Sequence, residues 1–329
     1  DWHSDYASRV SPKLAVLYNI SPRLRVRTSV GTGFKAPTML ELYQPRVETF
    51  GYATDHVGCE SGVSPCALVS YPAVRGGNPD LEPHESESWT AGIVWNATDR
   101  FVLELTYYDI EYTNSVGQLW MQAMFDREYD GLSHGVVRYP DGRVNYVEVT
   151  QINLSGKKTS GIDFSASYAL NTERAGLFDF TLESTWPQSF EEEVQEGDGF
   201  EDLLDWLGYP KNRANLMVNW TMGAFQATWV THYLSDHGKS EGWCWPSDTD
   251  APCEEGSTPV VMDDFWSHDL QLAWNARWNG QFAIGARNLF NEDPPYHECC
   301  MLPVAPYEAQ WNLYDPTGRS IYLRYRQEF

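Results

Sequence analysis

Cysteine is the residue with the most evident chemistry in this sequence, and its six copies fall into three close pairs. An even count at short spacing favours disulfides that close local loops in an oxidising compartment. CxxC spacing is absent, so a zinc ribbon is not expected. His297 and Glu298 precede two adjacent cysteines and resemble a soft-metal cluster, but neighbouring cysteines seldom bind one ion together, and a disulfide is favoured. The candidate disulfide cysteines are Cys59, Cys66, Cys244, Cys253, Cys299 and Cys300.

Carboxylates crowd the segment 187–209, which has no lysine or arginine, and residues 235–264 show a similar excess. Several carboxylate oxygens together could hold Ca²⁺ or a cationic ligand. The alternative is a solvated surface loop, and the spacing matches no calcium motif. We therefore predict no cofactor and no metal site, with Ca²⁺ in the acidic loops left open. The acidic residues of 187–209 are Glu191, Glu192, Glu193, Glu196, Asp198, Glu201, Asp202 and Asp205.

Tryptophans recur in or beside the same segments. Their rings could stack on a sugar or an aromatic ligand, or they could belong to a loop core or a membrane-interface belt. Trp243 and Trp245 flank Cys244, in a loop that Cys253 would tighten, and they are the first choice for ligand contact. The candidate ligand-binding residues are Trp206, Trp243, Trp245, Trp266 and Trp311.

Neither catalysis nor nucleic-acid binding is indicated. The sequence contains no GxSxG elbow and no HExxH helix, so we expect a protein that is not an enzyme. The formal charge of −23 excludes a nucleic-acid partner, because phosphates require basic patches.

The elements that carry these residues alternate with a period of two, as β-strands do. Leu24, Val26 and Val30 share one face of a strand, and Arg23, Arg25 and Arg27 share the other. Neither lipid nor a packed core would accept three arginines. A water-filled lumen accepts them, and Arg324 and Arg326 take the same place in the last strand.

About 11 such strands follow one another, joined alternately by short links and by long ones. This segregation of loop length is typical of outer-membrane barrels, in which short turns are periplasmic and long loops extracellular. Such a strand spans the membrane with ~9–11 residues, so no run of ~20 apolar residues is needed. Aromatic residues form 14% of the chain, which suits two interfacial girdles. The predicted fold is all-β: a transmembrane antiparallel β-barrel of the bacterial outer membrane.

Several segments resemble the family blocks of TonB-dependent outer-membrane receptors. They are GTGFKAPTMLELY (Gly31–Tyr43), GGNPDLEPHESESWTAGI (Gly76–Ile93), PKNRANLMVNW (Pro210–Trp220), GARNLFNEDPPY (Gly285–Tyr296) and GRSIYLRYRQEF (Gly318–Phe329). The resemblance implies that residues 1–329 are the C-terminal half of a 22-stranded barrel, without the plug domain and TonB box. It also implies that Phe329 is a barrel-assembly signal. The lumen arginines would then meet the plug or guide an anionic substrate.

The resemblance implies a receptor for TonB-dependent uptake of a scarce nutrient, such as a siderophore, vitamin, carbohydrate or peptide. The alternatives are a passive porin-like channel and a carbohydrate-binding surface protein. The implied partners are outer-membrane lipid, lipopolysaccharide (through divalent ions at the acidic loops), the plug with the other barrel half, the TonB–ExbB–ExbD complex and the barrel-assembly machinery.

Overall fold

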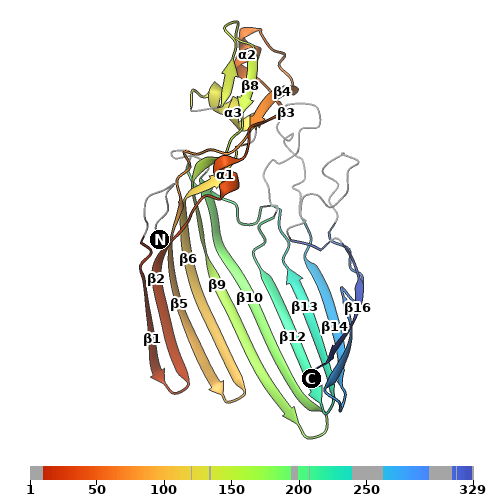
Figure 1. Ribbon diagram of the computed structural model, residues 1–329. Coiled ribbons are helices and arrows are strands. Elements are labelled where there is room, and N and C mark those ends of the chain that lie inside the picture. Colours follow the sequence, from red (N-terminus) through yellow and green to blue (C-terminus); the bar gives the residue numbers. More distant parts are fainter. Residues whose placement is uncertain are drawn as a thin grey trace.

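The computed structural model describes residues 10–119, 121–132, 135–193, 199–206, 208–238, 262–295, 313–315 and 317–327. Within these residues, long strands form one curved sheet, and a smaller folded unit stands above one end of it (Figure 1). None of the helices in the described ranges combines the length and the apolar character needed to cross a membrane.

The large sheet is antiparallel throughout, and each strand of its main path pairs with its neighbours in that path. Among the described strands, β1 and β16 form its two edges, so the sheet is open. A further strand, β11 (Glu201–Asp202), pairs with β10. The main path has eleven strands, which confirms the predicted number. They are β1 (Lys13–Ser21), β2 (Leu24–Lys35), β5 (His84–Thr98), β6 (Phe101–Gly117), β9 (Ile152–Thr172), β10 (Gly176–Glu193), β12 (Arg213–Met222), β13 (Phe225–Leu234), β14 (Phe265–Asn275), β15 (Gly280–Arg287) and β16 (Ser320–Gln327).

Connections at the two ends of the sheet differ in length, as predicted. The short turns are residues 22–23, 99–100, 173–175, 223–224 and 276–279, and they lie together at the lower end (Figure 1). Glycine or asparagine takes the positive φ that a tight turn needs at Gly223 and Asn279. The long connections all leave the opposite end.

The strand register sorts the side chains onto two faces. Val26, Ile93 and Leu105 are cross-strand partners on one face. Arg27, Gly92 and Thr106 are partners on the other. The apolar face is open to the surroundings: Leu323, for example, is 80% exposed. A soluble protein seldom leaves so wide an apolar surface uncovered, and lipid is the environment that suits it.

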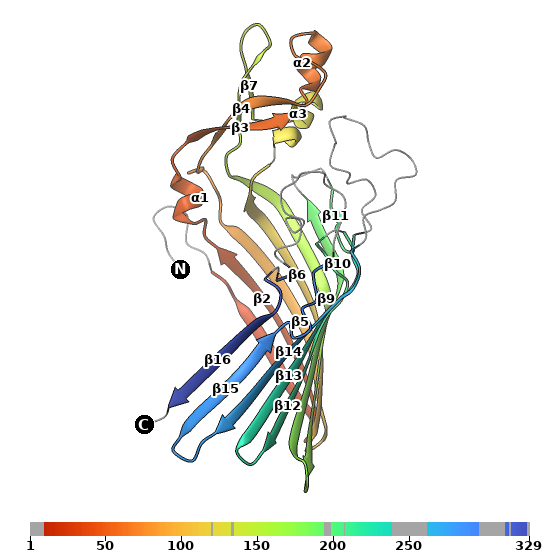
Figure 2. The ribbon, with the colours of Figure 1, turned by 90° about the vertical axis from the view of Figure 1, so that its right-hand side faces the viewer.

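The sequence did not predict the smaller unit, which we call the cap. The alternation predicted long links at about Thr32–His84 and Asn114–Arg143, but residues 36–83 and 118–151 fold together. Their strands β3 (Val47–Ala53), β4 (Val69–Arg75), β8 (Val144–Glu148) and β7 (Val136–Arg138) form a second sheet in the order β3-β4-β8-β7. The helices α2 (His56–Ser61) and α3 (Met121–Tyr129) complete the cap, and α1 (Met39–Tyr43) lies below it (Figure 2).

The cap has its own hydrophobic core. Phe125 of α3 is 1% exposed and contacts Tyr71 of β4, with ring centroids 4.9 Å apart. Ala53 and Val147, from the two different connections, are fully buried in the same cluster. Burial of this kind is what stabilises a small unit against the entropy of ordering its chain.

Asparagines join the cap to the wall of strands. Asn153 of β9 donates through Nδ2 to the carbonyls of Glu82 and Asn114, both at 2.9 Å, and its Oδ1 accepts from the Glu82 amide at 2.9 Å. Asn78 donates to the Gln151 carbonyl at 3.0 Å. The two connections that build the cap are therefore fixed to each other at its base.

Candidate functional site: the polar face of the strand wall

Arginines on β2 lie on the polar face, as the alternation predicted for Arg25 and Arg27. Arg27 forms an ion pair with Glu104 of β6 and donates to the Thr106 hydroxyl at 2.9 Å. It reaches them across Gly92, where a Cβ would come within 3.2 Å of the arginine Nε. Arg27 is thus held by its neighbours rather than extended into open space.

Arg23 differs from the prediction, because it lies in the turn between β1 and β2 rather than inside a strand. Its Nη1 donates to the Ala97 carbonyl at 3.2 Å, and its Nη2 lies 3.7 Å from Asp99 Oδ1. Alternation alone could not show that the strand begins at Leu24. Arg23 is therefore a residue of the turn end of the sheet.

Arg324 and Arg326 occupy the polar face of β16, opposite Ala283 and Gln281 of β15. Tyr322 of β16 reaches over Gly285 of β15, and its hydroxyl donates to Gln271 Oε1 of β14 at 3.1 Å. The small residues of β15 leave room for the larger side chains of β16. This end of the wall is therefore cationic and lined by hydrogen-bonding groups.

The middle of the polar face carries carboxylates, a hydroxyl, an amide and a histidine. Thr185 donates to Asp163 at 2.7 Å, and His232 lies 2.7 Å from Asn215 Oδ1 and 3.5 Å from Asp269 Oδ2. Groups of this kind need water or polar partners around them. A hydrated passage along this face suits them, and it could guide a polar solute by hydrogen bonds and charge.

The structure locates two of the predicted tryptophans. Trp206 is half-buried in the connection between β11 and β12. Trp266 lies on β14, 49% exposed, with its ring centroid 4.4 Å from that of Tyr233. Trp266 shares the apolar face with Leu270, four pairs further along the register. This position also suits an interfacial girdle, the alternative considered for these tryptophans. Trp243, Trp245 and Trp311 lie outside the described residues.

One predicted disulfide is present in the cap. Cys59 of α2 is bonded to Cys66, with Cα atoms 4.9 Å apart. The remaining cysteines of the prediction, Cys244, Cys253, Cys299 and Cys300, lie outside the described part of the chain, as does Phe329.

The acidic segment is partly ordered into strands. Glu191, Glu192 and Glu193 extend β10, and Glu192 pairs with Lys157 at 3.0 Å. Asp205 is nearly buried and pairs with Lys211 at 2.7 Å. In the ranges that the structure describes, no three His, Cys, Asp or Glu residues are arranged to hold a metal ion. Two carboxylates thus have protein cations as partners.

The sequence also gave no indication of a buried charge network in the cap. The Asp55 side chain is 0% exposed, and Arg138 lies between it and Glu128. Burial raises the pKa of Asp55, but hydrogen bonds from Arg138, Gly58 and Ser64 outweigh burial, so the pKa lies below its usual value. Hydrogen bonds to Glu128 and Asp55 raise the pKa of Arg138. Asp55 also caps α2 through the Gly58 amide, at 2.8 Å.

Comparison with solved structures finds the same fold in siderophore receptors and in an iron transporter. The siderophore receptor PirA from Acinetobacter baumannii is 14% identical with a TM-score of 0.64, covering 98% of this chain and 41% of its own. The ferric enterobactin receptor PfeA from Pseudomonas aeruginosa is 16% identical with a TM-score of 0.65, and the match covers 96% of this chain and 40% of PfeA. The FrpB iron transporter from Neisseria meningitidis is 11% identical with a TM-score of 0.58, and the match covers 98% of this chain and 40% of FrpB.

The chain thus spans about two fifths of the length of these receptors. A comparison with curated proteins finds no match. A family model described as "TonB dependent receptor-like, beta-barrel" matches residues 1–289. This family consists of transport receptors of the outer membrane rather than enzymes. The chain belongs to the TonB-dependent receptor family and forms part of its β-barrel.

Proposed function

We propose that this chain forms part of the wall of an outer-membrane receptor that takes up a scarce extracellular nutrient with energy delivered by TonB. The ligand is a siderophore, vitamin, carbohydrate or peptide. Iron complexes are the first to test, because the names of the solved neighbours describe siderophore, ferric enterobactin and iron transport.

The observation that carries this proposal is the contrast between the two faces of one sheet. The exposed apolar face suits lipid, and the opposite face is lined by Arg27, Glu104, Asp163 and their polar neighbours. A wall of this kind separates a membrane from an aqueous passage. The cap, at the end of the sheet away from the short turns, lies on the extracellular side in this proposal.

Arg25, Arg27, Arg324 and Arg326 face the lumen and contact the plug domain of the whole receptor. Cations on a passage wall also attract anionic solutes, so the same residues guide an anionic ligand once the plug moves. Trp206, Trp243, Trp245, Trp266 and Trp311 remain the proposed ligand contacts. The TonB–ExbB–ExbD complex acts on the whole receptor, lipopolysaccharide surrounds the long loops, and the barrel-assembly machinery inserts the barrel by reading Phe329.

The test is solute uptake by cells that carry or lack the receptor gene, each with and without tonB. The probes are a ⁵⁵Fe-loaded catecholate siderophore, cobalamin, a maltodextrin and a tripeptide, each supplied at nanomolar concentration. Uptake of at least one probe should be lost when either gene is deleted. Receptor-dependent uptake that continues without tonB would show a passive channel instead.

A further inference from the structure

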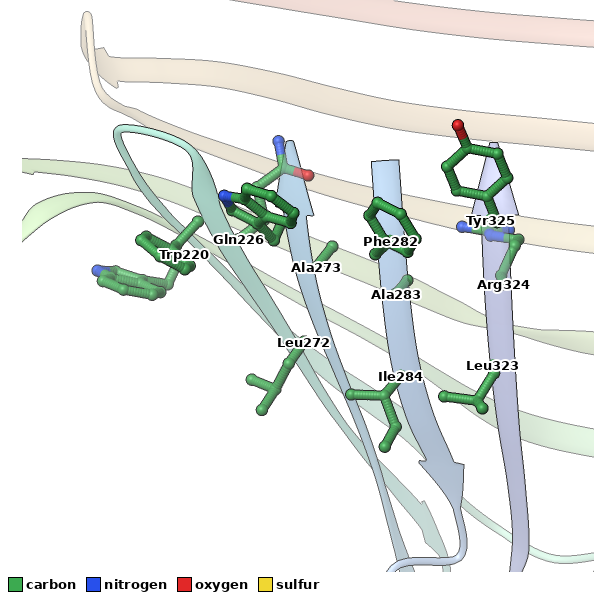
Figure 3. A pocket seen from close by; sticks show the side chains of 12 residues that line it. Trp220, Gln226, Leu272, Ala273, Phe282, Ala283, Ile284, Leu323, Arg324 and Tyr325 are labelled. Carbon is green, nitrogen blue, oxygen red and sulfur yellow. The ribbon is translucent and has the colours of Figure 1, made fainter. Parts of the chain in front are cut away.

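A hollow in the described part of the chain lies beside the apolar face, and Gln226 and Arg324 of the polar face also line it. It measures about 750 Å³ and spans β12 to β16. Figure 3 shows Leu272, Ile284 and Leu323 side by side across β14, β15 and β16. These three residues are cross-strand partners in the register, so the floor of the hollow is a continuous aliphatic row.

Aromatic rings border this hollow towards the short turns. Trp274 packs edge-on against Trp278, with ring centroids 5.7 Å apart, and Phe282 lies 4.7 Å from Tyr325 by the same measure. Trp278 belongs to the turn between β14 and β15, residues 276–279. Aromatic rings at this level mark the interface between hydrocarbon and headgroups. These rings therefore place the short-turn end of the hollow at the level of the headgroup layer.

Charge at the short turns is opposite to that of the chain as a whole. The five turns hold four arginines (Arg23, Arg100, Arg174 and Arg277) against two carboxylates (Asp99 and Glu173), whereas the whole chain holds 23 basic and 46 acidic residues. Arg277 is exposed and directly precedes Trp278. Arg277 therefore places a cation in the turn next to Trp278, whose ring contacts Trp274 at the border of the hollow.

We propose that this hollow binds an anionic phospholipid of the inner leaflet, with an acyl chain on Leu272, Ile284 and Leu323 and the phosphate on Arg277. The planar guanidinium can bind two phosphate oxygens at once. Such a contact distinguishes a specific lipid site from the general layer of lipid around a membrane protein. The short-turn end attracts an anionic headgroup, although the protein as a whole repels it. The proposal depends on the membrane position of the sheet and not on which nutrient is carried.

The test is native mass spectrometry of the purified membrane protein in detergent, titrated with phosphatidylglycerol or with phosphatidylcholine of the same acyl chains. Phosphatidylglycerol should bind more tightly. Arg277→Gln should weaken its binding about fivefold, the contribution of one cation near an anionic lipid surface. Arg100→Gln makes the same change of charge at a turn away from the hollow and should have no effect.

A second variant tests the acyl-chain position. Ile284→Trp fills the hollow while leaving Arg277 in place, and Ile284 is half exposed, so the strand can carry the larger ring. It should weaken binding of both lipids. Equal binding of the two lipids by the unmodified protein, or equal losses in R277Q and R100Q, would mean an unspecific lipid layer and overturn the proposal. Unchanged binding in I284W would also overturn it.

Discussion

Arg138 binds both carboxylate oxygens of Asp55, with Nη1–Oδ2 at 2.9 Å and Nη2–Oδ1 at 2.6 Å. The two residues lie 83 positions apart and belong to the two different connections that build the cap. Arg138 also binds Glu128 through Nε at 2.7 Å, so one guanidinium joins three segments. This ion pair can therefore form only when the two connections fold together into the cap.

Asp55→Asn should destabilise the cap by about 3 kcal/mol, because it removes the charge of one partner in a buried ion pair and leaves the other uncompensated. Hydrogen exchange measured peptide by peptide should show faster exchange in α2 and β7 and unchanged exchange in β9 and β10. Asp141→Asn is the matched control. Asp141 pairs with Arg143 at 2.8 Å, but the side chains are 52% and 68% exposed, and such pairs contribute less than about 1 kcal/mol.

Acid should loosen the cap in a defined pH window. The pKa of Asp55 is lower in the folded protein than in the unfolded chain, where it is about 3.9. Its contribution to stability is thus present above the unfolded pKa, declines below it, and is lost once the pH has fallen through the folded pKa. Opening of α2, measured by hydrogen exchange and corrected for intrinsic rates, should stay constant from pH 6 to about pH 4.5 and increase as the pH falls below about 4. Asp55→Asn should show a smaller increase; an equal one would place the acid sensitivity elsewhere.

Loss of the Cys59–Cys66 bond should free α2 from the adjoining loop. The closed loop is short, so the double variant Cys59→Ala/Cys66→Ala should cost about 2 kcal/mol of local stability. Limited proteolysis should then cut between Asp55 and Cys66. Reductant should increase this cleavage in the unmodified protein and leave it unchanged in the variant. Equal cleavage of both oxidised proteins would show that the bond does not hold this segment.

Gly161 of β9 is needed for the close packing of the polar face. A Cβ there would lie 2.4 Å from the Tyr108 hydroxyl and 2.7 Å from the Trp186 carbonyl oxygen, and the carbonyl is backbone that cannot easily move. Gly161→Ala should therefore lower barrel stability by about 1–3 kcal/mol. The heat-dependent gel shift of the folded barrel measures this, with Ser165→Ala on the same face of β9 as the control. If Gly161→Ala were as stable as the control, the neighbouring strands would be able to accommodate a Cβ at this position, and the close packing would not depend on glycine.

Period-two alternation was enough to predict the strand wall, because it depends only on residues that are close in the sequence. Leu103 and Leu105, for example, mark one face of β6 whatever surrounds the chain. The cap could not be predicted in this way. Its buried core joins Ala53, Phe125 and Val147 from distant segments, and no local pattern shows that these segments meet. Asp55 and Arg138 look like ordinary loop charges until the two connections come together.

The candidate site was predicted unevenly for the same reason. Arg25 and Arg27 follow from alternation, but the boundary of a strand does not, so Arg23 was placed in the strand rather than in the turn. Trp266 continues the apolar face of β14, but His268 interrupts the pattern between it and Leu270, which hides the connection. Where a polar residue stands on an apolar face, alternation ceases to be informative.

Leu182 and Thr181 are neighbours on β10 that point to opposite faces, and they test the central claim that one face contacts lipid and the other lines an aqueous passage. Leu182 lies midway between the aromatic residues Phe178 and Trp186 of the same strand, as expected near the bilayer centre. The measurement is the free energy of unfolding from phospholipid vesicles. Leu182→Arg should lower it by about 2–4 kcal/mol, and Thr181→Arg should leave it nearly unchanged. Equal losses in both variants, or a larger loss at Thr181, would contradict the account.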